Sequence, residues 1–311
     1  MNRLRQSTPP SPFETRLRRS SGRTARFLSI QNMLALSGLV LSVGCGNPPA
    51  PARTDLPRRI VSVTITGDVV LQALVDSSRV LAVSALADDS GIHEAAGLFP
   101  AKPRVGPDLE RIVSMRPDLV LLGSFHDPAF LHAIRQSGLP VEVLESPRSF
   151  EDVRGFLRRV SGRLGSGASG DSLVGWMDST LNAAREKTRG CPGKPRVLYW
   201  SDGYTAGDSS TVGEMLEWIG AKNAAAELGL TGSKPISVED ALRLAPDWVL
   251  RSGWEGMGGM KAFPQALQDL PAVRDGRVVV VPGKWLLSTS HRMAFGADSL
   301  ARSLAGACKG R

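Results

Sequence analysis

Hydrophobic positions along residues 59–144 follow two alternating periods. Short apolar runs rich in β-branched residues predict strands, and segments with an apolar residue every three or four positions predict helices. The predicted strands cover residues 60–65, 79–84, 118–122 and 139–144. The predicted helices cover residues 67–75, 108–115 and 127–137. Because strands and helices alternate, we expect an α/β fold with a parallel sheet covered on both faces.

A longer helical region follows. Residues 149–152 have the spacing of a helix cap with acidic side chains in the first turn. The helical pattern breaks across residues 165–170 and continues as a second helix over residues 171–188. Alternation then resumes, with predicted strands at 197–200, 247–250 and 277–281 and predicted helices at 212–219, 238–244, 263–270 and 291–305.

Residues 109–124 and 238–253 form an internal repeat. Each segment is a predicted helix, a Pro-Asp turn and a predicted strand, and every matched pair is separated by the same 129 positions. The repeat aligns Glu110 with Glu239. A unit of this length is too long for a solenoid array. It predicts two similarly built lobes joined by the helical region between them.

The positive charge of the chain is concentrated near its start. Residues 1–44 hold seven arginines and one glutamate, which is +6 of the formal net charge of +8, so residues 45–311 carry +2. A nearly neutral domain has no electrostatic footprint for phosphate backbones, and we expect no nucleic-acid partner. Basic residues followed by the apolar run 33–43 are typical of an export signal, because the run is too short to span a bilayer.

Residues 41–45, Leu-Ser-Val-Gly-Cys, resemble a lipobox, in which the cysteine is lipidated. We therefore expect a lipoprotein-type signal peptide over residues 1–44 and a lipid on Cys45. A plain signal peptide with a chance cysteine is the alternative. The proline-rich residues 45–58 are predicted to be an extended tether. The expected location is the periplasm or cell envelope, with the protein anchored to a membrane by lipid.

The mature chain is expected to contain an N-terminal lobe at 59–148, linking helices at 149–192 and a C-terminal lobe at 193–311. An oxidising compartment permits a disulfide between Cys191 and Cys308. The sequence leaves the pairing open, because it does not show that their Cα atoms approach each other.

Several segments in order carry a resemblance to a known family. They are Arg59-Ile60-Val61-Ser62, the two repeated units, residues 211–225 and residues 270–278. Over residues 57–305 the chain resembles the class III periplasmic binding proteins, which serve ABC importers of cobalamin, haem and ferric siderophores. The resemblance implies two similar lobes with mainly parallel sheets joined by a single long helix, near residues 171–188. It also implies a limited hinge motion, a ligand held between the lobes and an ABC permease as partner.

The resemblance further implies that one carboxylate on each lobe docks onto arginines of the permease. Glu110 and Glu239 hold the matching positions. Such charge pairs would favour registry and encounter rate. The alternative is that each glutamate only complements a helix N-terminus, and both roles are compatible.

Candidate ligand contacts follow the ends of predicted strands, where aromatic faces suit flat macrocycles. The first lobe offers Thr64, Phe125 and His126, and the second offers Trp200, Asp202, Tyr204, Trp254 and Trp285. For the aromatic residues the alternative is packing within a lobe. Trp285 matches a tryptophan of cobalamin binders, but Lys284 and Ser288 replace the neighbouring acid and arginine of those proteins.

The ligand is expected to be a metal chelate, with cobalamin or a related corrinoid favoured over haem and ferric siderophores. No cofactor and no protein-bound metal site are expected, and the protein is expected to be a monomer. His126 and His291 are alternative axial ligands for haem iron. A secreted tetrapyrrole-acting enzyme such as a metal chelatase, using these histidines, is a second class. A receptor lipoprotein without a permease is a third.

Overall fold

The computed structural model describes residues 56–89, 99–253 and 263–309, with the side chains of residues 307–309 excepted. Residues 53–311 form one compact unit. The predicted signal peptide, Cys45 and most of the tether lie outside the described residues, as does Trp254. None of the described helices is both long and apolar enough to cross a membrane.

The first lobe is built on a five-stranded sheet in which every pairing is parallel, as predicted. The strands, in spatial order, are β3 (Arg104–Val105), β2 (Val80–Ser84), β1 (Ile60–Ser62), β4 (Leu119–Gly123) and β5 (Val141–Leu144). The helices are α1 (Ile65–Leu74), η1 (Ser77–Arg79), α2 (Leu109–Ser114) and α3 (Pro128–Gln136).

Alternate residues of the central strands enter different cores. Ile60 and Leu119 belong to one apolar cluster, whereas Val61 and Val120 belong to another on the opposite face. Because successive side chains of a strand point to opposite faces, this division shows that the sheet is covered on both sides. The near-continuous apolar runs of the sequence reflect that double burial.

Two linking helices follow, α4 (Phe150–Leu164) and α5 (Gly167–Thr188). Ser149 and Asp152 form a capping box at the start of α4, as the sequence predicted. Gly165 ends α4 with a left-handed φ of 70°, a conformation that glycine adopts readily. Since only Gly165 and Ser166 separate the helices, α5 begins at residue 167, four positions before the prediction.

The second lobe is built on a four-stranded parallel sheet. Its strands, in spatial order, are β11 (Val278–Pro282), β10 (Trp248–Gly253), β6 (Arg196–Tyr199) and β8 (Lys222–Asn223). A separate antiparallel pair consists of β7 (Tyr204–Ala206) and β9 (Ser233–Pro235). The helices are α6 (Thr211–Trp218), η2 (Ala224–Leu228), α7 (Val238–Leu244), α8 (Gln265–Gln268), α9 (Pro271–Arg274), α10 (Gly283–Leu286) and α11 (Met293–Lys309).

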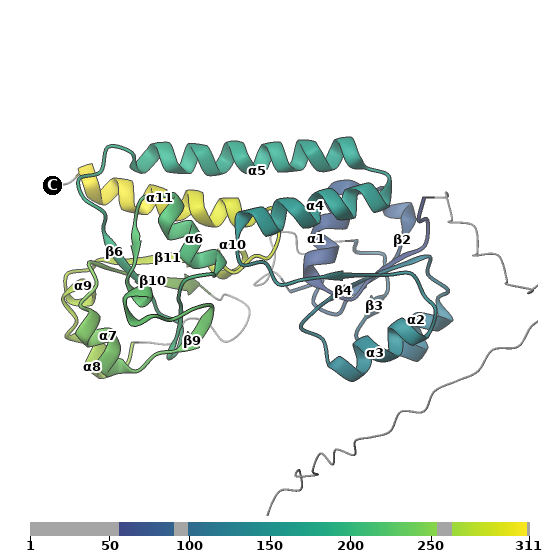
Figure 1. The fold of residues 1–311 in the computed structure, drawn as a ribbon, viewed down its shortest axis with the longest axis horizontal. Helices are drawn as coiled ribbons and strands as arrows, with labels where there is room; N and C mark the ends of the chain where they lie inside the picture. The colour runs from purple at the N-terminus through teal and green to yellow at the C-terminus, as the bar shows by residue number, and fades with distance from the viewer. Residues whose placement is uncertain (1–55, 90–98, 254–262, 310–311) are drawn as a thin grey trace, which may run out of the picture. The chain divides into compact units, whose positions relative to one another are not determined.

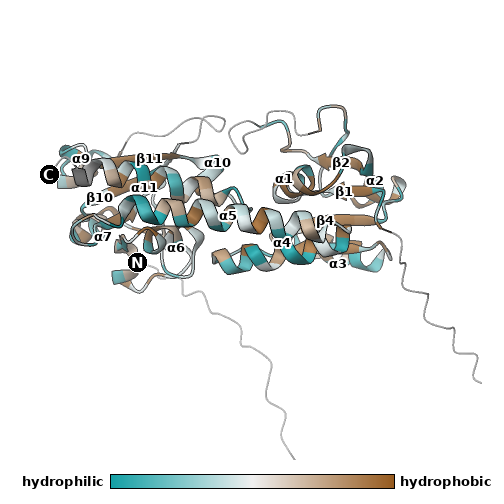
Figure 2. Ribbon diagram, turned by 90° about the horizontal axis from the view of Figure 1, so that it is seen from above, coloured by the Kyte–Doolittle hydropathy of each residue, from teal (hydrophilic) through white to brown (hydrophobic). Residues whose placement is uncertain are grey.

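Helix α11 returns along α5, and Figure 1 shows the two side by side. Lys187 on α5 and Asp298 on α11 form an ion pair of 2.6 Å. Figure 2 shows brown strands and, on α4, teal turns that alternate with brown ones, which is the amphipathic pattern expected of a helix that covers a sheet.

The internal repeat is present in three dimensions. Asp108 caps α2 by accepting from the amide three residues on, and Ser237 caps α7 in the same way. Asp118 accepts from the amide of Arg59 at 2.9 Å, and Asp247 accepts from the amide of Arg196 at 2.8 Å. Each lobe therefore fixes its helix–turn–strand unit to its first strand with the same contacts.

Candidate ligand-binding site

The predicted residues of the first lobe gather where β1 and β4 end. Since these strands are parallel neighbours, the segments after them lie at one edge of the sheet. The Nε2 atom of His126 donates to the carbonyl of Val63 at 3.1 Å. The ring of His126 lies 4.8 Å from the ring of Phe125 and 5.7 Å from that of Phe130, centroid to centroid. Partial burial lowers the pKa of His126, which favours a neutral imidazole at pH 7.

Phe125 and Thr64 have opposite environments. Phe125 is 67% exposed and presents most of its ring to solvent. Thr64 is 2% exposed, and its Oγ1 has no hydrogen-bond partner among the described residues. This burial does not favour ligand contact by Thr64, and its place in the site stays a prediction.

In the second lobe a tight hairpin follows β6. The amides and carbonyls of Ser201 and Tyr204 bond to each other in both directions at 2.9 Å. Asp202 and Gly203 between them have φ values of 47° and 84°, as a type I′ turn requires. The hairpin carries Asp202 and Tyr204 beyond the sheet, and Tyr204 is 54% exposed.

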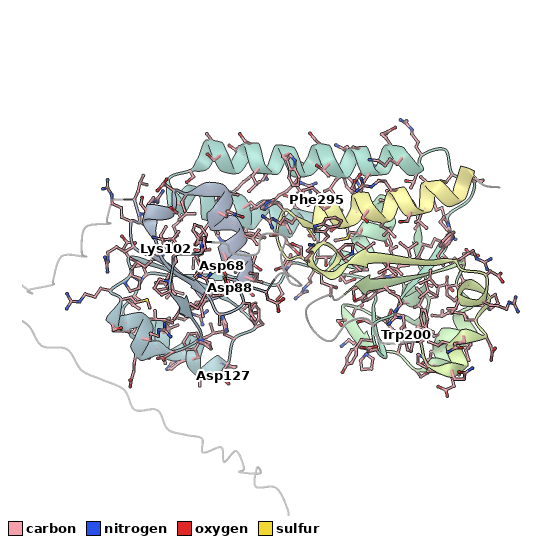
Figure 3. The ribbon with its side chains drawn as sticks, turned by 180° about the vertical axis from the view of Figure 1, so that it is seen from behind. Asp68, Asp88, Lys102, Asp127, Trp200 and Phe295 are labelled. Carbon is pink, nitrogen blue, oxygen red and sulfur yellow. The ribbon has the colours of Figure 1, made fainter. Side chains whose placement is uncertain are left out.

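Trp200 is a correction to the sequence analysis. It is 2% exposed and packs with Leu198 and Val249 in the second core of the lobe, and Figure 3 shows it inside that lobe. Residues two apart on a strand share a face. Trp200 therefore continues the inward face of Leu198 and presents no ring to a ligand.

Trp285 belongs to the packing between helices α10 and α11. It is partly buried against the main core, and its ring centroid lies 5.8 Å from that of Phe295. The Nζ of Lys284 lies 6.0 Å from the same ring. Part of the indole is accessible, so packing and ligand contact are compatible for this residue.

Arg251 is a candidate site residue that the sequence analysis did not name. It is buried near the end of β10, and its guanidinium carbon lies 4.5 Å from the ring centroid of Phe263. Burial lowers the pKa of Arg251, and the nearby carboxylate of Asp202 opposes that effect. The internal repeat could have identified this residue, because Arg251 aligns with Leu122 of the first lobe, which is fully buried. A charge at a core strand position points to an electrostatic role.

The two lobes meet at the segments that follow β1 and β11. The hydroxyls of Thr66 and Thr289 are hydrogen-bonded, and Arg292 donates to the side-chain oxygen of Gln72 at 3.1 Å. Beside these contacts lies a cavity of about 50 Å³, lined in part by Val69 and Leu287. Sites for drug-sized ligands are typically about 300–1,000 Å³. A chelate would therefore need the other loops at the strand ends.

His291 is also a correction. It is buried, and its ring packs edge-on against Trp176 of α5 at 5.7 Å between centroids. Burial, with the adjacent Arg292 charge, lowers its pKa to about 4. His291 belongs to the helix packing and is not placed to ligate haem iron. Within the described residues no group of three or more His, Cys, Asp or Glu side chains could hold a metal ion.

The sequence of residues 60–284 matches the family model described as periplasmic binding protein. The chain belongs to this family. Among its relatives is the uncharacterized ABC transporter substrate-binding lipoprotein YvrC of Bacillus subtilis, 26% identical over 86% of this chain and 94% of that protein. The vitamin B12-binding protein of Vibrio parahaemolyticus is 23% identical over 73% of this chain and 82% of that protein.

Solved structures show the same fold. The periplasmic heme-binding protein RhuT of Roseiflexus sp. RS-1 has a TM-score of 0.67 and 26% identity, covering 81% of this chain and all but 1% of that one. This family fold accounts for the two parallel sheets and the linking helices. It confirms the fold class predicted from the sequence.

Glu110 and Glu239, the docking residues implied by the family resemblance, occupy equivalent places on α2 and α7. Both are exposed, and neither forms an ion pair or side-chain hydrogen bond with another described residue. Figure 1 shows α2 and α7 on the side of their lobes away from α5.

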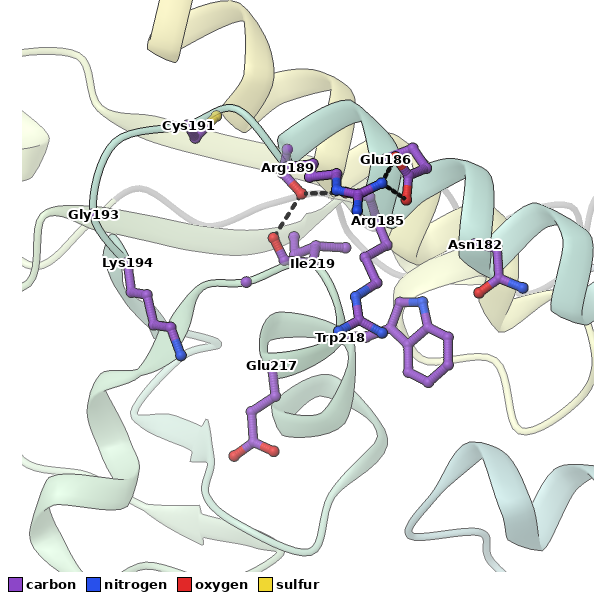
Figure 4. A pocket seen from close by; sticks show the side chains of 12 residues that line it. Asn182, Arg185, Glu186, Arg189, Cys191, Gly193, Lys194, Glu217, Trp218 and Ile219 are labelled. Atoms are coloured by element: carbon purple, nitrogen blue, oxygen red, sulfur yellow. Dashed lines mark hydrogen bonds and ion pairs between the residues drawn. The ribbon is translucent and has the colours of Figure 1, made fainter.

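A further cavity, of about 580 Å³, lies between the end of α5 and α6, and Figure 4 shows its lining. Arg189 pairs with Glu186 at 3.0 Å, and the guanidinium of Arg185 lies 5.6 Å from the ring of Trp218. Cys191 at its rim is disulfide-bonded. The side chain of Cys308 is outside the described side chains, so their pairing stays a prediction.

Proposed function

We propose that this protein is the extracytoplasmic binding component of an ABC importer, which captures a metal chelate between its lobes and delivers it to a permease. The observation that carries the proposal is the meeting of the two lobes beyond the ends of β1 and β11, through Thr66 at the start of α1 and Thr289. In a member of the periplasmic binding protein family, ligands are expected at that edge of parallel sheets.

The proposed ligand is cobalamin or a related corrinoid. Exposed aromatic rings at the strand ends of both lobes, Phe125 and Tyr204, support a broad and partly apolar ligand. The similarity to a vitamin B12-binding protein favours the corrinoid. Haem is the second candidate, favoured by the likeness to RhuT and by the neutral His126 beside Phe125. Ferric siderophores remain in the same ligand class.

The proposed partner is the permease, with Glu110 and Glu239 as docking residues. Their exposed carboxylates form no ion pair or side-chain hydrogen bond with another described residue, which supports this role, because no described partner has to be displaced before they bind basic groups. We also propose that a lipid on Cys45 holds the protein at the cell envelope, and the naming of the relative YvrC as a lipoprotein supports this. A receptor without a permease would leave these two glutamates without a function in transport.

The ligand proposal is tested with residues 46–311, titrated with cobalamin, haemin and ferric siderophores while tryptophan fluorescence is followed. We expect saturable quenching at submicromolar concentration by cobalamin. Phe125→Ala and Tyr204→Ala should each weaken binding about tenfold or more, as aromatic contacts at a binding centre do. Val280→Ala, on an exposed position of β11, is the matched control and should bind normally.

Saturation by haemin alone would replace the corrinoid by haem and leave the importer role intact. Failure of every chelate to bind would overturn the metal-chelate assignment. The chelatase alternative depended on His126 and His291 together, and the burial of His291 removes its support. Turnover of a tetrapyrrole by the purified protein would restore it.

A further inference from the structure

Two exposed aliphatic side chains occupy equivalent positions of the repeat. Val113 on α2 is 41% exposed and Leu242 on α7 is 38% exposed, and both rank among the exposed large hydrophobic residues. Their numbers differ by 129, the offset of the repeat. Each lies three positions after a proposed docking glutamate, so on a helix it is a neighbour of that carboxylate on the same face.

The helices themselves do not require these side chains to be apolar. Ile112 and Ala241, the preceding residues, are fully buried and attach each helix to its lobe. Val113 and Leu242 point away from those cores. Neither side chain is well buried within its own lobe. Only contact with another molecule would therefore remove these aliphatic groups from water.

Other surface positions of the two helices have diverged. Arg111 matches Asp240, and Ser114 matches Arg243, so charge and size are not kept between the lobes at these positions. The carboxylate and the branched aliphatic residue are kept. A surface that repeats only this pair fits a partner that also presents the same features twice.

We propose that Val113 and Leu242, together with Glu110 and Glu239, form a docking face for two symmetry-related halves of the permease. Each half would present a basic group to the glutamate and an apolar surface about one helical turn, roughly 5 Å, further along. This inference rests on the proposed function and extends it. The ion pairs would govern registry and encounter rate, and the buried aliphatic contacts would govern the lifetime of the complex.

The test uses the full chain, expressed with its own leader, and the permease–ATPase complex of this importer in nanodiscs. Binding is measured without ligand for Val113→Thr, Leu242→Gln and the double variant, at low and high salt. We expect each single variant to weaken docking about three- to tenfold, chiefly through faster dissociation, and the double variant to weaken it by about the product. The loss should be similar at both salt concentrations.

Glu110→Gln and Glu239→Gln provide the comparison. Their effect should shrink at high salt, because exposed charge pairs are screened. Val280→Thr is the matched control, since Val280 is exposed to a similar extent but lies on β11. Thermal unfolding of each variant establishes that the lobes remain folded.

The outcomes separate the two proposals. Loss of docking in the glutamate variants with normal docking of the Val113 and Leu242 variants would overturn the aliphatic contact and keep the permease role. Normal docking of all variants would overturn both. An effect of Val113→Thr without an effect of Leu242→Gln would contradict the two-fold arrangement.

Discussion

At the scale of single residues, Asp68 is the most perturbed carboxylate of the described structure. It lies inside the first lobe, as Figure 3 shows. It accepts from the amide of Ser84 at 3.2 Å and from the hydroxyl of Ser84 at 2.5 Å. Burial raises its pKa from 3.8 to about 6, and these hydrogen bonds offset only part of that rise.

Asp68 therefore predicts a pH dependence of stability. Between pH 4 and 6 the folded state holds a proton that the unfolded state has released, so the free energy of unfolding falls as pH rises through this window. The shift corresponds to about 3 kcal/mol. Denaturant titrations of the wild type and Asp68→Asn at pH 4.5, 6 and 7.5 measure it. The stability of the wild type relative to the variant should decline with pH, and a constant difference would contradict the prediction.

At the scale of elements, the helix–turn–strand unit is the recurrent part of this molecule. Both copies turn through a residue other than glycine with a left-handed backbone, Arg116 at φ 47° and Ala245 at φ 40°. Arg59 donates to the carbonyl of Arg116 at 3.0 Å, and Arg196 donates to the carbonyl of Ala245 at 3.1 Å. These contacts hold a conformation that costs about 1–2 kcal/mol for an L-residue.

Glycine at the second of these turns should stabilise the protein. Ala245→Gly relieves the left-handed backbone, and after the entropy cost of glycine a gain of about 0.5–1 kcal/mol is expected. Ala183→Gly is the matched control, because residue 183 is exposed inside α5, where glycine should cost about 1 kcal/mol. Denaturant midpoints of the two variants should move in opposite directions. Destabilisation by Ala245→Gly would show that the turn is not strained.

At the scale of the whole molecule, one apolar core connects both lobes. It contains Ile60 and Leu121 of the first sheet, Met177 of α5 and Val281 of the second sheet. The linking helices α4 and α5 are therefore part of the shared apolar core and do not merely connect two independent domains. We expect the two lobes to unfold together.

Met177→Ala tests this coupling. Met177 is fully buried, and its truncation should lower the free energy of unfolding by about 2–5 kcal/mol. All six tryptophans follow residue 175, so their fluorescence does not report on the first lobe, whereas circular dichroism reports on both lobes. In this variant the unfolding transition followed by fluorescence and the one followed by circular dichroism should shift to the same midpoint. Separate unfolding transitions for the two probes would contradict a common core. The control is Ser179→Ala on the exposed face of α5, which should leave the free energy of unfolding nearly unchanged.

Periodicity and the internal repeat were sufficient for most elements of the fold. The predicted helix at 238–244 matches α7, and the repeated Pro-Asp turns located β4 and β10. The two-residue strands β3 and β8 were not predicted, because two residues are too few to show an alternation of apolar and polar positions. The predicted helix at 263–270 was too long, since Leu270 in extended conformation precedes the new helix α9.

The sequence by itself determined the alternation of strands and helices, the two equivalent lobes and the equivalent places of Glu110 and Glu239. These features depend on local patterns, which reflect backbone geometry and burial on one face. Only the tertiary structure decided that Trp200 and His291 are buried, that Phe125 and Tyr204 are exposed, and that Arg251 lies near Asp202. The residue type of an aromatic or charged side chain is compatible with either environment. Packing against residues distant in the sequence decides which environment it occupies.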